Sequence, residues 1–397
     1  MHGLVLEGGG AKGSYHIGVY KALIEEGIEI KGVAGTSVGA LNGAMIVQGD
    51  FEKAYDIWHE ISYSKIFNTN EDELNRVAAG KLSKEDISYL IDSFRGFFTD
   101  KGLDIAPLKN LLIELIDEEK IRNSGKDFGI VTVSLTDLKP LEIYIEDIPS
   151  GQVVEYLMAS AYLPVFKTER IDGKKYIDGG IYNNLPVNLL KNKGYKDLIL
   201  VRTHAPGVVR RINSEGLNII TISPKDNLGK VLDFDRETVR HNIKLGYFDA
   251  LRALRGLKGH HYYIEPIKGE NYVINYLLDL DEERIFKLKE LFKVDSIPNN
   301  RALFEFIIPK VAAILGVEKE ADYEDIFIFL LDKLAEIYEL ERFKIYCYDE
   351  LLNLVKENLN LEKNNKTSII DRIIEKVDLL TIFTKGEIIK EVGKIIL

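Results

Sequence analysis

The sequence lacks most of the residues that secreted and metal-binding folds depend on. It has a single cysteine, Cys347, so no disulfide forms within the chain and no cysteine pair can hold a metal ion. No run of about 18 apolar residues occurs, which argues against a membrane-spanning helix. The first residues contain no basic segment followed by an apolar one, as a secretion signal would. We therefore expect a soluble cytoplasmic protein.

The chain also lacks an excess of positive charge. The chain has 52 Lys and Arg against 63 Asp and Glu, a formal net charge of −11. This balance argues against nucleic-acid binding, and it weakens adsorption to anionic lipid. The length of 397 residues and the hydrophobic fraction of 46% allow one sizeable core and a second one. We expect two domains.

The first 40 residues predict a strand, a glycine loop, a helix and a second strand. The short apolar run at 4–6 is followed by Gly8-Gly-Gly-Ala-Lys-Gly13 and then by apolar residues at helical spacing over 15–26. A second apolar run covers 28–34. Two strands joined by one helix in so few residues indicate a parallel pair.

The predicted secondary structure changes near residue 270. Up to there, strands and helices alternate, which predicts a parallel-rich α/β sheet sandwiched between helices over residues 1–270. Residues 51–121 are mostly helix-periodic and include a helix at 84–91, while the glycine- and asparagine-rich stretch at 174–186 is expected to be loop. Residues 271–397 predict an all-helical domain, with its last two helices at 368–380 and 385–396.

The candidate nucleophile is Ser37, in the stretch Gly35-Thr-Ser-Val-Gly39. In a G-x-S-x-G motif the serine lies on a sharp turn between a strand and a helix, with its hydroxyl directed into a pocket. The flanking glycines are needed because the turn is strained and brings the helix close to the strand. Alone, the motif is moderate evidence, since a glycine-containing turn can arise by chance.

The glycine loop at 8–13 is suited to bind an anion, because the N–H groups at the start of a helix point outward and the helix dipole adds positive potential. Gly8, Gly10 and Gly13 also satisfy the dinucleotide pattern G-x-G-x-x-G. However, the second strand ends in Thr36-Ser37, where that fold needs an acidic residue. The oxyanion of an ester's tetrahedral intermediate is the favoured anion, because the loop and Ser37 follow adjacent parallel strands.

A serine nucleophile needs a base. A triad of Ser37 and Asp178 with His204, His241, His260 or His261 would follow the chain order of the α/β-hydrolases, but that fold places several strands before its nucleophile. The simpler candidate is Asp178 itself, in Ile177-Asp-Gly-Gly180. A carboxylate is a weaker base than imidazole by about 2.5 pK units, so this dyad requires a desolvated aspartate.

Taken in order, these stretches resemble the motifs of the patatin-like phospholipases. Gly8-Gly-Gly-Ala-Lys-Gly13, Gly35-Thr-Ser-Val-Gly39 and Asp178-Gly-Gly180 match that family's three motifs without gaps. The stretch Met158-Ala-Ser-Ala-Tyr-Leu-Pro164 is similar to the family's segment before the Asp-Gly-Gly motif. The resemblance covers residues 1 to about 205 and says nothing about the helical region.

The resemblance implies a Ser-Asp dyad without histidine, in which Ser37 is the nucleophile and Asp178 the base. It implies that the oxyanion is held by the amides of Gly9, Gly10 and Ala11. The remaining motif residues support these groups: Gly8, Lys12, Gly13, Gly35, Gly39, Gly179 and Gly180. It further implies a lipid acyl ester as substrate, with no metal and no organic cofactor.

We therefore expect a lipid acyl hydrolase of the phospholipase or esterase type that meets membranes transiently and binds no nucleic acid. A catalytically weak lipid-binding or signalling module is the alternative, and a nucleotide-binding protein is a weaker one. The helices of residues 271–397 could form a lid, a regulatory domain or a homo-oligomer surface, although plain structural packing is the default interpretation.

Overall fold

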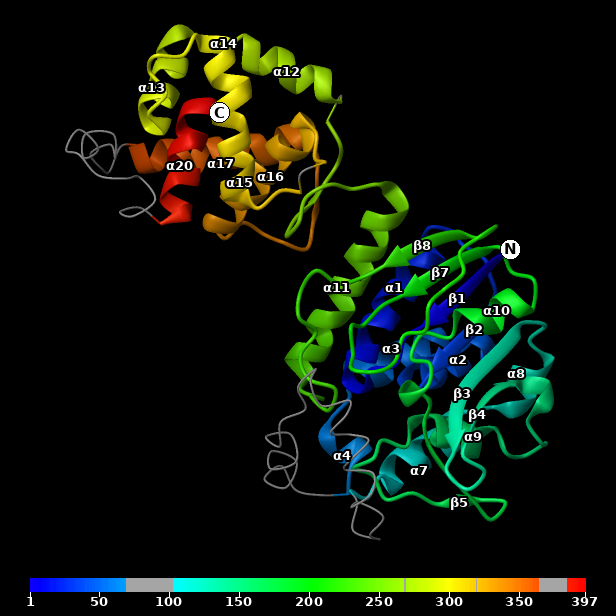
Figure 1. Ribbon diagram of the computed structural model, residues 1–397. Coiled ribbons are helices and arrows are strands. Elements are labelled where there is room, and N and C mark those ends of the chain that lie inside the picture. The colour runs from blue at the N-terminus through cyan, green and yellow to red at the C-terminus, as the bar shows by residue number, and fades with distance from the viewer. Residues whose placement is uncertain (69–102, 268, 319, 364–383) are drawn as a thin grey trace. The chain divides into compact units, whose positions relative to one another are not determined.

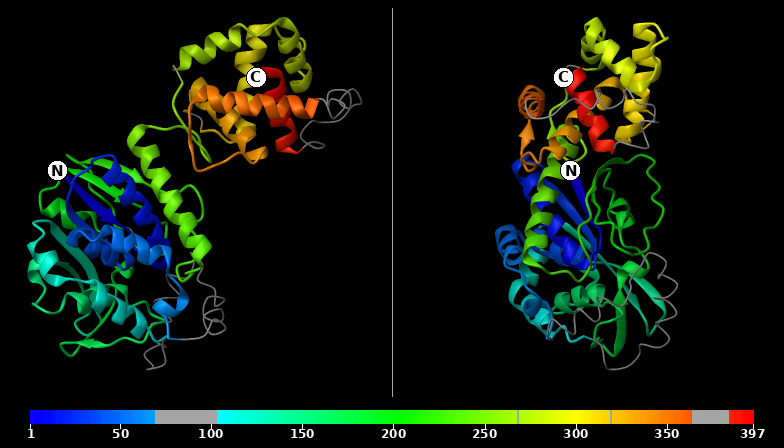
Figure 2. Two further views of the ribbon diagram at one scale, coloured as in Figure 1. Left: turned by 180° about the vertical axis from the view of Figure 1, so that it is seen from behind. Right: turned by 90° about the vertical axis from the view of Figure 1, so that its left-hand side faces the viewer.

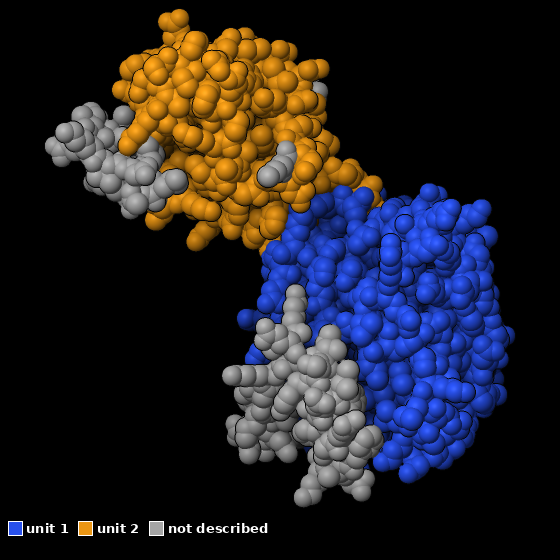
Figure 3. All heavy atoms as spheres, viewed as in Figure 1, with its two compact units in different colours: residues 1–253 blue, residues 254–397 orange. Residues whose placement is uncertain are grey.

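The computed structural model describes residues 1–68, 103–267, 269–318, 320–363 and 384–397. The helices expected at 84–91 and 368–380 lie outside the described residues. The chain forms two compact units, Met1–Ala253 and Leu254–Leu397, which Figure 3 shows in different colours. The assignment of an acyl hydrolase domain to residues 1–270 and of a separate helical domain to residues 271–397 stays a prediction.

A mostly parallel sheet lies at the centre of the first unit (Figure 1). Its strands are β1 (His2–Leu6), β2 (Ile30–Thr36), β3 (Asp127–Ser134), β4 (Lys139–Tyr144), β5 (Arg170–Ile171), β6 (Lys174–Asp178), β7 (Asp197–Val201) and β8 (Asn218–Ile222). They lie in the order β5-β6-β3-β2-β1-β7-β8, with β4 paired to β3. The neighbours from β3 to β8 are parallel, whereas β4, β5 and β6 form an antiparallel edge. The expected parallel-rich α/β sheet is confirmed.

Helices cover both faces of this sheet. They are α1 (Ser14–Glu25), α2 (Val38–Gln48), α3 (Phe51–His59), α4 (Tyr63–Ile66), α7 (Ala106–Leu115), α8 (Glu118–Asn123), α9 (Val153–Ala161), α10 (Val187–Asn192) and α11 (Arg236–Arg255). Gly43 of α2 lies against Val33 and Phe128, while Leu189 of α10 lies against Gly129. Because successive strand residues face opposite sides, Phe128 and Gly129 place α2 and α10 on opposite faces. The three-layer arrangement is that expected from the sequence.

The stretch at 174–186 differs from the expected loop. Its first residues form β6, which pairs antiparallel with β3 and buries Tyr176 and Ile177. A single turn of 3-10 helix, Gly179–Ile181, follows directly. The glycine and asparagine content pointed to a loop, but hydrogen bonding to β3 makes the residues before Gly179 a strand.

The second unit is a helical assembly around its own core (Figure 2). Its helices are α12 (Glu270–Leu278), α13 (Glu282–Phe292), α14 (Asn299–Ala302), the π-helical turn Leu303–Ile307, α15 (Ile308–Leu315), α16 (Tyr323–Ile337), α17 (Tyr348–Lys363) and α20 (Lys385–Ile396). Two strands of two residues each, β9 (Tyr263–Ile264) and β10 (Ile345–Tyr346), pair in parallel in this unit. The buried carboxylate of Asp332 accepts from the backbone N–H of Tyr262 at 2.7 Å, which fixes the loop before β9 to α16.

Candidate active site

Ser37 lies on a strained turn between β2 and α2. Its backbone has φ 55° and ψ −128°, a conformation that non-glycine residues rarely adopt. The turn is tight on both sides: a Cβ on Gly35 would lie 2.2 Å from the Gly39 carbonyl oxygen, and one on Gly39 would lie 2.3 Å from that of Leu6. The side chain of Ser37 is therefore held at the N-terminus of α2, where the helix dipole favours negative charge.

Strand register brings Asp178 to the level of Ser37. Thr36, the last residue of β2, pairs with Val131 of β3, and the next residue of β3, Thr132, pairs with Asp178. Asp178 ends β6, and both it and Ser37 are buried. A Cβ on Gly179 would lie 2.2 Å from the Val131 carbonyl oxygen, so the turn after Asp178 packs tightly on β3.

The Asp178 carboxylate is desolvated. Its Oδ1 accepts from the Gly180 N–H at 2.7 Å, whereas Oδ2 has no hydrogen-bond partner among the described residues. Burial raises the pKa of Asp178 to about 6, and the neighbouring Ser37 hydroxyl and the Gly180 N–H lower it in part. This pKa is close to the reference value of about 6.5 for histidine. A histidine-free dyad requires such a desolvated carboxylate.

The glycine loop follows β1 and lies beside the Ser37 turn, because Leu6 pairs with Gly35 across β1 and β2. Gly10 has φ 55° and lines the same cavity as Ser37. The Ala11 N–H donates to the Val231 carbonyl at 2.7 Å, and a Cβ on Gly10 would lie 2.2 Å from that same oxygen. The segment before α11 therefore packs directly on the glycine loop.

Two residues outside the predicted site residues, Ser160 and Asn184, hold the site together. The Ser160 hydroxyl accepts from the Ser37 N–H at 2.9 Å and donates to the Val131 carbonyl at 2.6 Å. Asn184 accepts from the Gly8 N–H at 3.1 Å, and its side chain would lie 2.8 Å from a Cβ on Gly180. Ser160 lies within the stretch 158–164 that carried the resemblance, which was the available signal; Asn184 was hidden by its loop-like composition.

An apolar cavity opens beside Ser37. Its walls come from α2, α3 and α7, from residues in and beside α4 and at the end of α9, and from the segment before α11. The last three groups are Ile61, Ile66 and Phe67; Ala161, Leu163 and Phe166; and Leu232 and Phe234. Trp58 of α3 stacks on Phe234, with ring centroids 6.4 Å apart, and donates its indole N–H to Asn42 at 2.8 Å. Asn42 also donates to the Gly13 carbonyl at 2.9 Å, so this polar wall residue has its partners within the protein. The cavity consequently presents mainly hydrocarbon to a ligand.

Two of the four candidate histidines, His204 and His241, belong to the first unit, and His260 and His261 belong to the second. In the part of the chain that the structure describes, no histidine is a hydrogen-bond partner of Ser37 or Asp178. His204 instead forms a 2.6 Å hydrogen bond with the Ser223 hydroxyl, and His241 lies on the exposed side of α11. His16 is fully buried near Asn42, and burial lowers its pKa to about 3, so its imidazole is neutral.

Neither a metal cluster nor a membrane span was found in the described ranges. No group of three or more His, Cys, Asp or Glu side chains there is arranged to hold a metal ion. None of the helices in the same ranges is long and apolar enough to cross a bilayer.

Comparison with known proteins adds to this geometry. A profile of the patatin-like phospholipase family matches residues 4–191, the stretch that contains the glycine loop, Ser37 and Asp178. Residues 4–191 belong to the patatin-like phospholipase family. The chain is 31% identical over 194 residues to the lysophospholipase NTE1 of Yarrowia lipolytica, a match covering 48% of this chain and 12% of that protein.

A patatin-like phospholipase domain-containing protein of Caenorhabditis elegans is 26% identical over 334 residues, which are 80% of this chain and 22% of that protein. Because 80% of 397 residues exceeds the 253 residues of the first unit, this similarity continues into the second unit. The chain thus spans about a fifth or less of the length of these relatives. The crystal structure of VipD from Legionella pneumophila matches with a TM-score of 0.41 and 14% identity, over 94% of this chain and 89% of VipD.

Proposed function

We propose that this chain is a lipid acyl hydrolase that cleaves carboxylic esters through a dyad of Ser37 and Asp178. The observation that carries the proposal is the register of β2, β3 and β6, which brings a buried serine on a strained turn to the level of a desolvated carboxylate. The apolar cavity beside Ser37 is suited to an acyl chain. The family to which residues 4–191 belong supports a lipid ester as substrate.

In the first half-reaction, Asp178 Oδ2 takes the proton of the Ser37 hydroxyl while Oγ attacks the ester carbonyl carbon. The carbonyl oxygen becomes an oxyanion, which the N–H groups of Gly9 and Gly10 stabilise. The Ala11 N–H joins them only when its bond to the Val231 carbonyl opens. The tetrahedral intermediate then collapses: the C–O bond to the alcohol breaks, Asp178 returns the proton to the leaving oxygen, and an acyl-enzyme remains.

In the second half-reaction, Asp178 takes a proton from water, whose oxygen attacks the acyl-enzyme carbonyl. The same amides hold the new oxyanion. When the intermediate collapses, Ser37 leaves, recovers the proton from Asp178, and the fatty acid departs. One carboxylate with a pKa near 6 serves both steps, because it is ionised at neutral pH and is still basic enough to accept a proton.

Hydrolysis of a short nitrophenyl ester and labelling by a fluorophosphonate test the proposal together. The wild-type chain should hydrolyse nitrophenyl butyrate and carry the phosphonate on Ser37, located by peptide mass spectrometry. Ser37→Ala should lose both, while Ser124→Ala, at the end of α8, should keep both. Hydrolysis that survives in Ser37→Ala contradicts the assignment, and a wild-type chain that neither labels nor hydrolyses indicates a lipid-binding module instead.

The absence of histidine from the dyad needs a separate comparison. Asp178→Asn should lower kcat by about 10³-fold or more, since it removes the base without changing the shape of the side chain. His204→Ala should keep kcat within about twofold, because His204 bonds Ser223 rather than Ser37. Equal losses in the two variants would disprove the histidine-free mechanism.

A further inference from the structure

The cavity beside Ser37 extends along α2. The α2 residues that line it are spaced at i, i+3, i+4 and i+7: Val38, Leu41, Asn42 and Met45. This spacing places them on one face of the helix, in line from the nucleophile's turn toward the helix C-terminus. From Val38 to Met45 the helix rises by about 10 Å, at about 1.5 Å per residue.

A second helix, α7, also lines the cavity. The lining residues of α7 repeat the spacing: Leu108, Leu111, Leu112 and Leu115. The C-terminal ends of α2 and α7 meet, because the Gln48 amide donates to the Leu115 carbonyl at 2.9 Å and lies 3.5 Å from Met45 Sδ. Met45 and Leu115 therefore lie together at the end of the cavity remote from Ser37.

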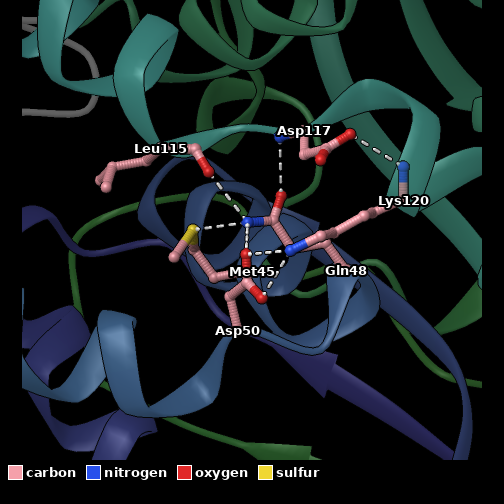
Figure 4. Close-up of polar contacts among 6 residues, drawn as sticks. All are labelled: Met45, Gln48, Asp50, Leu115, Asp117 and Lys120. Atoms are coloured by element: carbon pink, nitrogen blue, oxygen red, sulfur yellow. Dashed lines mark hydrogen bonds and ion pairs between the residues drawn. The ribbon is translucent and has the colours of Figure 1, made fainter.

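This far end is fixed by polar contacts around Gln48 (Figure 4). The buried Gln48 side chain also donates to Asp50 at 2.9 Å and accepts from the Asp117 N–H at 3.0 Å, so it ties the end of α2 to the turn after α7. Asp50 in turn forms an ion pair with Lys120 at 3.0 Å. A buried amide with these partners holds α7 at one position along α2, which makes the length of the cavity a fixed property of the fold.

Ala54 closes the same end from α3. The Trp58–Asn42 hydrogen bond sets α3 beside α2, and Ala54 lies one turn before Trp58, toward the Asp50 turn that joins the two helices. Ala54 is buried and lines the cavity with Met45 and Leu115. Its small side chain leaves room that a larger residue would fill.

We propose that Met45, Leu115 and Ala54 set the acyl-length specificity of this chain and that its preferred acyl group is medium-length, octanoyl to decanoyl. An extended alkyl chain advances about 1.3 Å per methylene, from carbon–carbon bonds of about 1.5 Å in staggered geometry. The 10 Å of α2 beyond the nucleophile's turn thus accommodates about eight methylenes. Gln48 is a positioning residue that acts through Leu115. The inference rests on the proposed function, because it assigns the cavity beside Ser37 to the acyl chain of the substrate.

The test is a series of monomeric nitrophenyl esters from butyrate to palmitate, hydrolysed by the full chain. For the wild type, kcat/KM should rise by about fourfold per methylene, the equivalent of about 0.8 kcal/mol, up to octanoate or decanoate and should not rise beyond it. Met45→Ala should move the maximum to longer esters, and Ala54→Leu should move it to shorter ones. Gln48→Ala should broaden the profile, whereas the matched variant Met158→Ala, on α9 and outside the cavity lining, should leave the maximum in place.

Binding separates a failure of this inference from a failure of the proposed function. Saturated fatty acids of 6 to 16 carbons are titrated into Ser37→Ala by calorimetry, a measurement that needs no catalysis. Affinity should increase up to about 8 to 10 carbons and then level off, with the limit moved by Met45→Ala and Ala54→Leu. A wild-type profile that climbs steadily to palmitate, or a limit that neither variant moves, overturns the proposal whether or not the chain hydrolyses esters.

Discussion

Ser160 supports Ser37 through its backbone rather than through its hydroxyl. The Ser160 side chain accepts from the Ser37 N–H at 2.9 Å and donates to the Val131 carbonyl of β3 at 2.6 Å. A serine in a sparsely populated backbone conformation persists only where the surroundings hold it there. The two hydrogen bonds of Ser160 anchor the Ser37 turn to the strand that also pairs with Asp178.

Ser160→Ala should therefore slow hydrolysis without weakening substrate binding. The variant leaves the buried Ser37 N–H without its acceptor, which costs about 1–3 kcal/mol of stability, and it loosens the turn. We expect kcat to fall by about 10-fold to 100-fold with KM nearly unchanged. The matched variant Ser134→Ala removes a buried hydroxyl of β3 that bonds Asp137, and it should leave kcat unchanged. A Ser160→Ala enzyme with wild-type kcat would show that the turn needs no such anchor.

The pH dependence of hydrolysis should reflect the Asp178 carboxyl. Since burial raises its pKa to about 6, and only the carboxylate accepts the serine proton, kcat/KM should increase with pH and reach a plateau above about pH 7. The midpoint should lie about two units above the reference aspartate value of about 3.9. A kcat/KM profile that stays flat from pH 5 to 8 would exclude Asp178 as the titrating base.

The same raised pKa predicts that the dyad destabilises the fold at neutral pH. A carboxyl whose pKa is higher in the folded state is harder to ionise there, so the penalty is absent below the unfolded value of about 3.9 and complete above about pH 6. Asp178→Asn removes the charge and retains an oxygen that can accept from Gly180. Urea unfolding should find the variant more stable than wild type by up to about 3 kcal/mol at pH 8, with the difference vanishing near pH 4. A variant less stable than wild type at pH 8 would contradict this account.

Gly10 and Gly27 form a matched pair for testing the glycine loop. Both have positive φ, but a Cβ on Gly10 would lie 2.2 Å from the Val231 carbonyl oxygen, whereas one on Gly27 would meet nothing within 4 Å. Gly27→Ala should cost about 1 kcal/mol of stability and leave hydrolysis intact. Gly10→Ala must in addition displace the segment before α11, so it should lower kcat/KM by about 10²-fold or more. Equal kcat/KM values for the two variants would show that the glycine loop takes no part in the reaction.

The short-range part of this fold follows from the sequence. The glycine loop, the turn at Ser37 and the alternation of β1, α1 and β2 are local patterns, and the structure has them at the expected positions. The strand ending at Asp178 was missed because glycine and asparagine next to it indicate a loop, while the pairing with β3 that makes it a strand involves residues about 45 positions apart. A histidine-free dyad requires a desolvated carboxylate, and the structure buries Asp178 so that its pKa is raised to about 6.

Contacts between distant segments could not be predicted in this way. No pattern in the sequence connects Ser160 with Ser37, Val231 with Ala11, or Gln48 with Leu115, because each pair meets only after the sheet and its helices are assembled. The sequence leaves the lining of the cavity undecided, because leucines of α7 at helical spacing fit both the cover of an apolar pocket and an ordinary core. What distinguishes them is that α2 and α7 leave space between their apolar faces.

Trp58 is the only tryptophan of the 397 residues, and its indole forms part of the cavity wall. It is buried, stacked on Phe234 and hydrogen-bonded to Asn42. All tryptophan fluorescence of the chain therefore arises from one place, and a hydrocarbon chain that enters the cavity changes the surroundings of that single fluorophore. The protein carries its own optical probe of this cavity, with which the proposed entry of an acyl chain can be tested in real time on the unlabelled chain.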